Sequence, residues 1–182
     1  MTEPTDVLRD EHVLILRALE VLEAAALRVA GGGHVDDAWW ARIIAWLRGF
    51  ADRNHHVKEE CLLFPAMERA GVPVAGGPIG VMLEEHADGR ALIRAMEATA
   101  GVDRAANARR YISLLRAHID KENGILFPLA DSILDDNARR ALSRDFSAVA
   151  DELGLDASLA GASAEVTAMA GALATEAVTT QR

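Results

Sequence analysis

The chain of 182 residues is long enough to form one domain around its own hydrophobic core. Hydrophobic residues make up 51% of it and charged residues 26%, a composition typical of folded proteins, which excludes a disordered chain. The formal net charge of −9 argues against a nucleic-acid partner, because nucleic acids select a basic surface. The single cysteine, Cys61, excludes an intrachain disulfide and suits a reducing compartment.

Nothing in the sequence predicts a membrane segment. The N-terminal residues MTEPTDVLRDEH are acidic and lack the apolar stretch of a secretory signal. The longest uncharged run, 70–83, is rich in glycine and proline, so we interpret it as a loop. A membrane helix needs about 20 apolar residues. We therefore expect a cytoplasmic protein without a membrane partner.

Apolar periodicity predicts an all-α fold with four main helices. The first covers about 5–30 and stops at three glycines, and the second runs from the Asp36-Asp37 caps to Gly71. Pro65 is expected to end or kink the second helix. The third covers about 78–99, and Asp103 is the expected cap of the fourth.

The C-terminal part differs from these four helices. A fifth amphipathic helix is predicted over 137–153, and the chain becomes rich in alanine, serine and threonine from Leu155. We interpret the latter as a tail or a loosely docked helix. The predicted organisation is a bundle over residues 1–135 and a helical extension over 136–182.

Two copies of one pattern organise the main helices. NHHVKEECLLFP (54–65) matches AHIDKENGILFP (117–128) at an offset of 63, and VLRDEH (7–12) matches VMLEEH (81–86) at an offset of 74. Each copy is a helical hairpin, and two hairpins predict an antiparallel, up-down four-helix bundle.

The repeat also aligns the histidines. Counted back from the proline of each copy, His118 matches His55 rather than His56. Four residues before His55 is Ala51, whereas four residues before His56 is the charged Asp52, so His55 is expected to face the core and His56 a solvent-facing flank. If this register is right, the variant His56→Ala should keep the metal. If it is wrong, His56 and Glu60 are the alternative ligands.

Inward-facing histidines on four helices, with two carboxylates one turn beyond two of them, predict a metal site with two ions. A single histidine on an apolar face is usually a core residue, so the argument depends on the coincidence of the whole set. Nitrogen and carboxylate donors favour iron, with manganese or zinc as alternatives. The predicted ligands are His12, His55, Glu59, His86, His118 and Glu122.

This pattern resembles the hemerythrin-like (HHE cation-binding) domain over roughly residues 5–131. The resemblance implies a non-haem di-iron centre in which the four histidines are terminal ligands while Glu59 and Glu122 bridge. The family's oxygen carriers use five histidines, one glutamate and one aspartate. We interpreted Glu59 as occupying the place of an extra histidine, which argues against simple reversible oxygen carriage.

Several neighbouring residues have an open role. Glu11 and Glu85 each precede a predicted ligand and could reach the metal, and Glu85 and Tyr111 are candidates for tuning the centre. Lys58 and Lys121 are expected to be solvated charges. The two Leu-Phe-Pro segments, 63–65 and 126–128, are expected to pack under the site.

The expected function is that of a di-iron protein that binds or processes a small oxidant: hydrogen peroxide, nitric oxide or dioxygen. Whether it turns the ligand over as an enzyme is left open. The alternatives are reversible binding or sensing of dioxygen or nitric oxide, and iron storage. A ferritin-like site is disfavoured because the chain contains no Glu-x-x-His pair.

Overall fold

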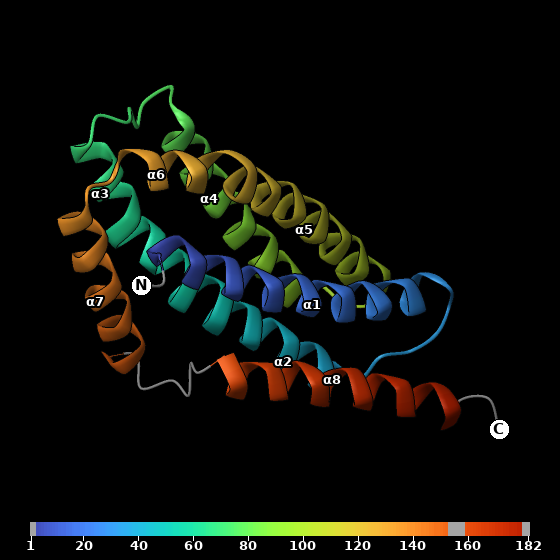
Figure 1. The fold of residues 1–182 in the computed structure, drawn as a ribbon. Helices are drawn as coiled ribbons and strands as arrows, with labels where there is room; N and C mark the ends of the chain where they lie inside the picture. The colour runs from blue at the N-terminus through green and yellow to red at the C-terminus, as the bar shows by residue number, and fades with distance from the viewer. Residues whose placement is uncertain (1–2, 153–158, 180–182) are drawn as a thin grey trace.

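A computed structural model describes residues 3–152 and 159–179, and within these ranges the chain is helical and contains no strand (Figure 1). The predicted all-α fold is confirmed. Three of the helical segments, labelled η, are π-helical, with i→i+5 hydrogen bonding. The elements are α1 Pro4–Ala30, α2 Asp37–Trp46, η1 Leu47–His56, η2 Glu59–Leu63, α3 Phe64–Arg69, α4 Pro78–Ala98, α5 Gly101–Lys121, η3 Glu122–Leu126, α6 Phe127–Ile133, α7 Asp136–Glu152 and α8 Leu159–Thr179.

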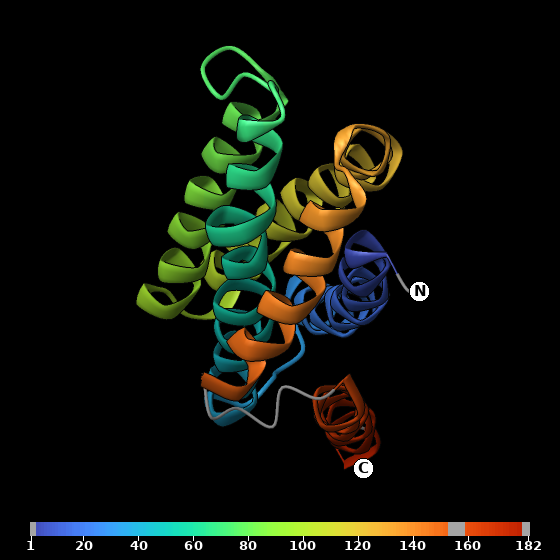
Figure 2. The ribbon, with the colours of Figure 1, turned by 60° about the vertical axis from the view of Figure 1, so that its left-hand side comes forward.

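Four long rods form the bundle: α1, the path from α2 to α3, α4, and the path from α5 to α6 (Figures 1 and 2). The α4–α5 and α1–α5 pairs pack most extensively. Gly71 closes α3 with φ 101°, a conformation that suits glycine. The fourth rod begins earlier than expected: its N-cap is Ala100, and Asp103 lies within the first turn.

Pro65 was expected to end or kink the second rod, and it does not end it. Helix continues through it to Arg69, because Pro65 lies in the first turn of α3 and directly after the π-helical η2. Proline is tolerated in a first turn, where its missing N–H removes no helical hydrogen bond. Pro128 takes the same position in α6, directly after η3. The repeated Leu-Phe-Pro thus marks the same π-to-α junction in both copies.

The buried apolar side chains form two separate clusters. One cluster fills the bundle between α1, α2, η1 and α5 and includes Leu19, Ile43 and Leu47. The other joins α3, α4, α6 and α7 and includes Leu63 and Phe127. Along α1, the buried His12 lies between Leu8 of the second cluster and Ile15 of the first. A layer of polar side chains therefore separates the two apolar parts of the core.

Two further helices cover the bundle. The predicted fifth helix is α7, although Leu153, its predicted end, lies outside the described residues, as does Leu155. Helix α8 runs beside α1 and α2 (Figure 1). It is packed rather than loosely docked: Val166 is fully buried, and Trp39 and Trp46 donate their indole N–H groups to α8 carbonyls at 2.9 and 3.2 Å. The predicted domain boundary at residue 135 stays a prediction.

In the described part of the chain, no helix is both long enough and apolar enough to cross a membrane.

Candidate metal centre

Five histidines and two glutamates meet between the apolar clusters, and all seven side chains are buried. They form two groups, and within each group the candidate ligand atoms all lie within 4.8 Å of one another. Glu59 belongs to both groups, so they are adjacent. The first group is His56, Glu59, His86 and His118; the second is His12, His55, Glu59 and Glu122.

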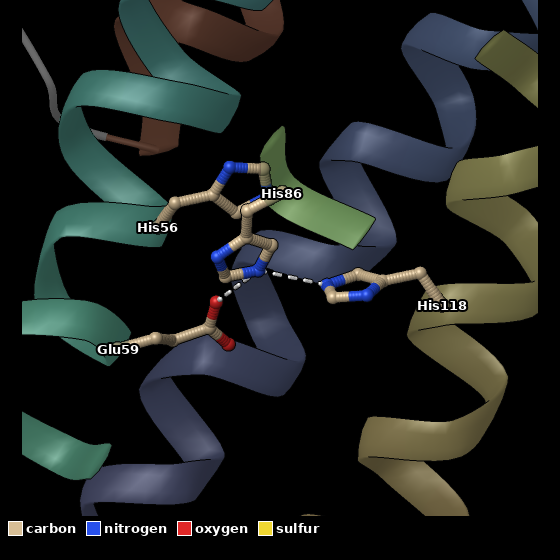
Figure 3. Close-up of side chains that lie close together, drawn as sticks. All are labelled: His56, Glu59, His86 and His118. Atoms are coloured by element: carbon tan, nitrogen blue, oxygen red, sulfur yellow. Dashed lines mark hydrogen bonds and ion pairs between the residues drawn. The ribbon is translucent and has the colours of Figure 1, made fainter. Parts of the chain in front are cut away.

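The first group draws on three rods (Figure 3). The Nε2 atom of His86 lies 3.0 Å from Nε2 of His118 and 3.4 Å from Oε2 of Glu59. His56 stacks on His86 with ring centroids 3.8 Å apart. Three imidazoles and one carboxylate thus converge on a single point.

The second group draws on α1, η1, η2 and η3. The Nε2 atom of His12 lies 3.2 Å from Oε2 of Glu122, and Nε2 of His55 lies 3.4 Å from Oε1 of Glu59. Glu122 also lies 3.2 Å from Nε2 of His118, a member of the first group. Both carboxylates therefore extend between the two groups, as bridging ligands would.

The expectation that His56 lies on a solvent-facing flank is wrong, since His56 is only 4% exposed. Asn54, His55 and His56 are consecutive and all buried, although they span about 200° of a regular α-helix at about 100° per residue. In π-helical η1 each residue turns through a smaller angle, which brings neighbours closer to one face. The expectation that His55 faces the core is confirmed, and His56 joins it there.

Acceptor side chains around the candidate ligands contact the second ring nitrogen, Nδ1, of four histidines. Four Nδ1 atoms lie 2.7–2.9 Å from a side-chain oxygen of another helical segment. His56 differs, because its nearest acceptor, Asp52 Oδ1, is 3.5 Å away. The pairs are His12 with Asn123, His55 with Glu11, His86 with Glu60, and His118 with Glu85. Because carboxylate and amide oxygens only accept, each of these Nδ1 atoms carries a proton, so in the neutral imidazole Nε2 has the lone pair and turns it inward.

Each carboxylate that contacts a histidine Nδ1 also pairs with a lysine or arginine side chain. Lys58 pairs with Glu11 and Lys121 with Glu85, at equivalent places in the two copies of the repeat. Arg90 pairs with Glu60 at 2.7 Å and also with Asp52. The expectation that Lys58 is a solvated charge is therefore wrong: its side chain is 4% exposed, whereas that of Lys121 is 38% exposed.

The pKa values of the histidines in the site reflect the crowding of buried charges. Burial opposes protonation of His55, but attraction to Glu59 and the hydrogen bond to Glu11 outweigh it and raise the pKa of His55 to about 10. The pKa of His118 rises, against burial, through Glu122. Burial and the adjacent His86 hold the pKa of His56 well below its usual value. Without a metal, protons on some histidines thus balance the buried glutamates.

The donor set fits a metal ion. Among the described residues, Nε2 of His12, His55 and His56 and all four carboxylate oxygens of Glu59 and Glu122 have no hydrogen-bond partner. Buried polar atoms without partners cost about 1–3 kcal/mol each. The Nε2 lone pairs of His86 and His118 also face each other, so a cation or an added proton must lie between them. A cation at each group would satisfy all of these atoms together.

Two phenylalanine rings stack on histidines of the site. Phe127 stacks on His12 at 5.3 Å and Phe64 stacks on His86 at 6.0 Å, again as equivalents in the repeat. The expected packing of the Leu-Phe-Pro segments under the site is thus confirmed. Tyr111 is buried, burial raises its pKa, and its ring lies beside Gly89.

Sequence reasoning brought six of the seven side chains to one place and missed His56. The adjacent pair His55-His56 carried the signal, but helical periodicity assigns only one of two neighbours to a face. It also missed the amide of Asn123 behind His12, although Asn123 is the counterpart in the repeat of Glu60, which contacts His86 in the same way. Glu11 and Glu85, whose roles were open, contact histidines of other helices through Nδ1.

Comparison with known proteins gives one match. No curated protein and no solved structure matches the chain. Residues 3–130 match the hemerythrin HHE cation binding domain, and this range covers more than half of the chain and every member of the two groups. The chain therefore belongs to the hemerythrin HHE cation-binding domain family.

Proposed function

We propose that the bundle interior holds two iron ions and that this centre binds and processes a small oxidant: hydrogen peroxide, nitric oxide or dioxygen. One ion takes His56, Glu59, His86 and His118, and the other takes His12, His55, Glu59 and Glu122. The proposal keeps the six ligands expected from the sequence and adds His56 as the seventh.

The observation that carries the proposal is the common orientation of the imidazoles. Four histidines donate Nδ1–H outward to a fixed acceptor and present Nε2 inward, where both glutamates lie. Histidines that bind metals usually have this outer hydrogen bond, because it fixes the tautomer and raises the basicity of the ligand atom. Histidines that only fill a core have no need of such convergence.

Iron supplies redox chemistry and Lewis acidity when bound, and the mixed imidazole and carboxylate donors suit it. The chain holds and orients the donors: Glu11 and Glu85 each fix one imidazole, while Lys58 and Lys121 neutralise these carboxylates. Each ion would receive four donors from the chain. A metal that prefers six ligands would then keep room for a small molecule.

Reversible binding of dioxygen or nitric oxide is the second candidate function, and a specific observation favours it. With His56 the set contains five histidines and two carboxylates, the same numbers that the resemblance assigns to the oxygen carriers of this family. Only a set with four histidines disfavours reversible carriage. The donor set alone thus no longer disfavours it.

Metal content tests the proposal first. Protein produced with adequate iron and never exposed to chelators should contain about two irons per chain by mass spectrometry. Glu59→Ala should lose both ions because Glu59 belongs to both groups, whereas Asp10→Ala, an exposed acid of α1, should keep both. Zinc alone, or no metal, would refute the iron centre.

Absorption spectra then separate the two functions. Reduced protein is mixed with one equivalent of each oxidant under anaerobic conditions, and the solution is afterwards evacuated or flushed. Return of the starting spectrum indicates reversible binding. A second sample receives excess oxidant and a reductant, and consumption of more than one equivalent of oxidant per centre there indicates turnover.

A further inference from the structure

The repeat relates the residues beside the first group of candidate ligands to those beside the second. Beside the first group, Glu60 contacts Nδ1 of His86 and pairs with Arg90 at 2.7 Å. At the offset of 63 residues, the counterpart of Glu60 is Asn123, which contacts Nδ1 of His12 in the second group. The surroundings of the two groups can therefore be compared position by position.

The charged residues beside the first group have uncharged counterparts beside the second. Asp52, Glu60 and Arg90 form one network of ion pairs, and at the offsets of 63 and 74 residues their counterparts are Leu115, Asn123 and Leu16. Leu115 is buried, and Leu16 packs against the apolar cluster of the bundle. Both acids are thus absent together with the arginine that pairs with them, and the acceptor behind His12 is a neutral amide.

Asn123 gives His12 a weaker acceptor than a carboxylate would be. Its Oδ1 lies 2.9 Å from Nδ1 of His12, as close as Glu11 lies to Nδ1 of His55, but it carries no net charge. A hydrogen bond to an ionised acceptor is roughly twice as strong as one between neutral groups. It therefore raises the basicity of the opposite ring nitrogen more. Nε2 of His12 is accordingly a weaker metal donor than Nε2 of His55.

An amide also allows either tautomer of the neutral His12 ring. It contains both an acceptor and a donor, so after a half turn its NH₂ group can donate to Nδ1, whereas a carboxylate cannot. The ring then holds its proton on Nε2, which faces Oε2 of Glu122 at 3.2 Å. No proton is gained or lost in this exchange. The second tautomer occupies the ligand atom of His12 and so competes with a metal ion.

The second group depends strongly on His12, because it contains fewer imidazoles. The first group has three histidines, whereas the second has only His12 and His55. The difference follows from the repeat, since Ile119 is the counterpart of His56. Half of the imidazole donors of the second group are therefore affected by the amide of Asn123.

We propose that Asn123 is a positioning residue that makes the two metal ions unequal. The ion held by His12 and His55 binds more weakly, so it binds second and leaves first. This inference rests on the proposed metal centre and is independent of the oxidant that the centre meets. It concerns the affinity for a divalent metal ion and can be measured without any turnover.

Stepwise titration of the metal-free protein with Fe(II) tests the inference. The titration is anaerobic, a chelator buffers the free metal, and native mass spectrometry counts chains with no, one and two ions. The second dissociation constant should exceed the first by at least about 10-fold. Asn123→Asp should lower the second constant roughly 10-fold and leave the first unchanged, because it supplies an ionised acceptor of the same shape. Asn123 is half-buried, so the new carboxylate keeps contact with solvent.

Three further variants separate this role from packing and from charge alone. Asn123→Ala removes the acceptor and should raise the second constant, opposite to Asn123→Asp, whereas a residue that only packs would be harmed by both changes. Glu60→Gln makes the reverse change beside the first group and should raise the first constant roughly 10-fold. Asn107→Asp adds the same charge on α5, where the Asn107 side chain contacts Thr99, and should change neither constant.

The outcomes distinguish this inference from the metal centre on which it rests. Two ions bound with equal constants, or a second constant that Asn123→Asp leaves unchanged, would overturn the role of Asn123 and leave the metal centre intact. A wild-type chain that takes up no Fe(II) would overturn both.

Discussion

The substitution His56→Ala distinguishes the buried position that the structure gives His56 from the solvent-facing position that regular helical spacing predicts. His56 is buried, stacks on His86, and has neither ring nitrogen hydrogen-bonded within the described residues. As a ligand it matters only when metal is bound. As a packing residue it would matter in both forms. The two roles therefore predict different stabilities with and without metal.

The size of the effect follows from the number of donors. Sites with four protein ligands bind structural zinc with about 10–16 kcal/mol, so one donor contributes roughly 2.5–4 kcal/mol. His56→Ala should then weaken the ion held with His86 and His118 by roughly 10²–10³-fold. In the metal-free form, the lost packing of one ring is offset by removal of unpartnered buried nitrogens, at about 1–3 kcal/mol each. The metal-free melting temperature should change little.

Two measurements check this reasoning: iron per chain by mass spectrometry, and thermal unfolding with and without metal. His34→Ala is the control, because the His34 side chain is 79% exposed. Full metal content with unchanged affinity in His56→Ala would refute the ligand role. A loss of several kcal/mol in the metal-free form would show instead that His56 serves packing.

Three further outcomes are expected. The metal-free protein should become easier to unfold in urea as pH rises from 6.5 towards 10. The raised pKa of His55 contributes stability that is complete below pH 6.5 and is lost as pH rises to about 10. A stability that does not change with pH over this range would contradict this. Glu85→Ala should weaken metal binding roughly 10–100-fold in competition with a chelator, since it removes only the acceptor of His118; unchanged affinity would exclude that role. Val166→Asp should cost more than ~3 kcal/mol of unfolding free energy, because it places a charge under α8. Ala168→Asp, on the exposed face of α8, should cost almost nothing. Equal effects of the two substitutions would disprove the docking of α8.

The fold could be predicted because its determinants are local. Apolar spacing and glycine stops set the helices, and most observed boundaries lie within a few residues of the expected ones. The duplicated His-x-x-x-Glu and Leu-Phe-Pro segments placed His55 and His118 on the inner faces of their helices. These features depend on residues within one or two turns of each other, so the order of residues is enough to determine them.

The site was predicted only as far as regular helical geometry holds. His56 enters the centre because η1 and η2 are π-helical, and the same widening precedes Pro65, which therefore continues a helix instead of ending it. Sequence periodicity assumes one angle per residue, so a local change of that angle is invisible to it.

The sequence by itself determined a four-helix bundle with inward histidines and glutamates, because periodicity and repetition are properties of neighbouring residues. Only the tertiary structure decided which partner each charged group meets. Lys58 is buried because Glu11 from another helix pairs with it, and α8 packs on the bundle where its apolar side chains join the core and two tryptophans donate to its carbonyls. Such contacts join residues far apart in the chain, where burial makes an unpaired polar group costly and so selects the partner.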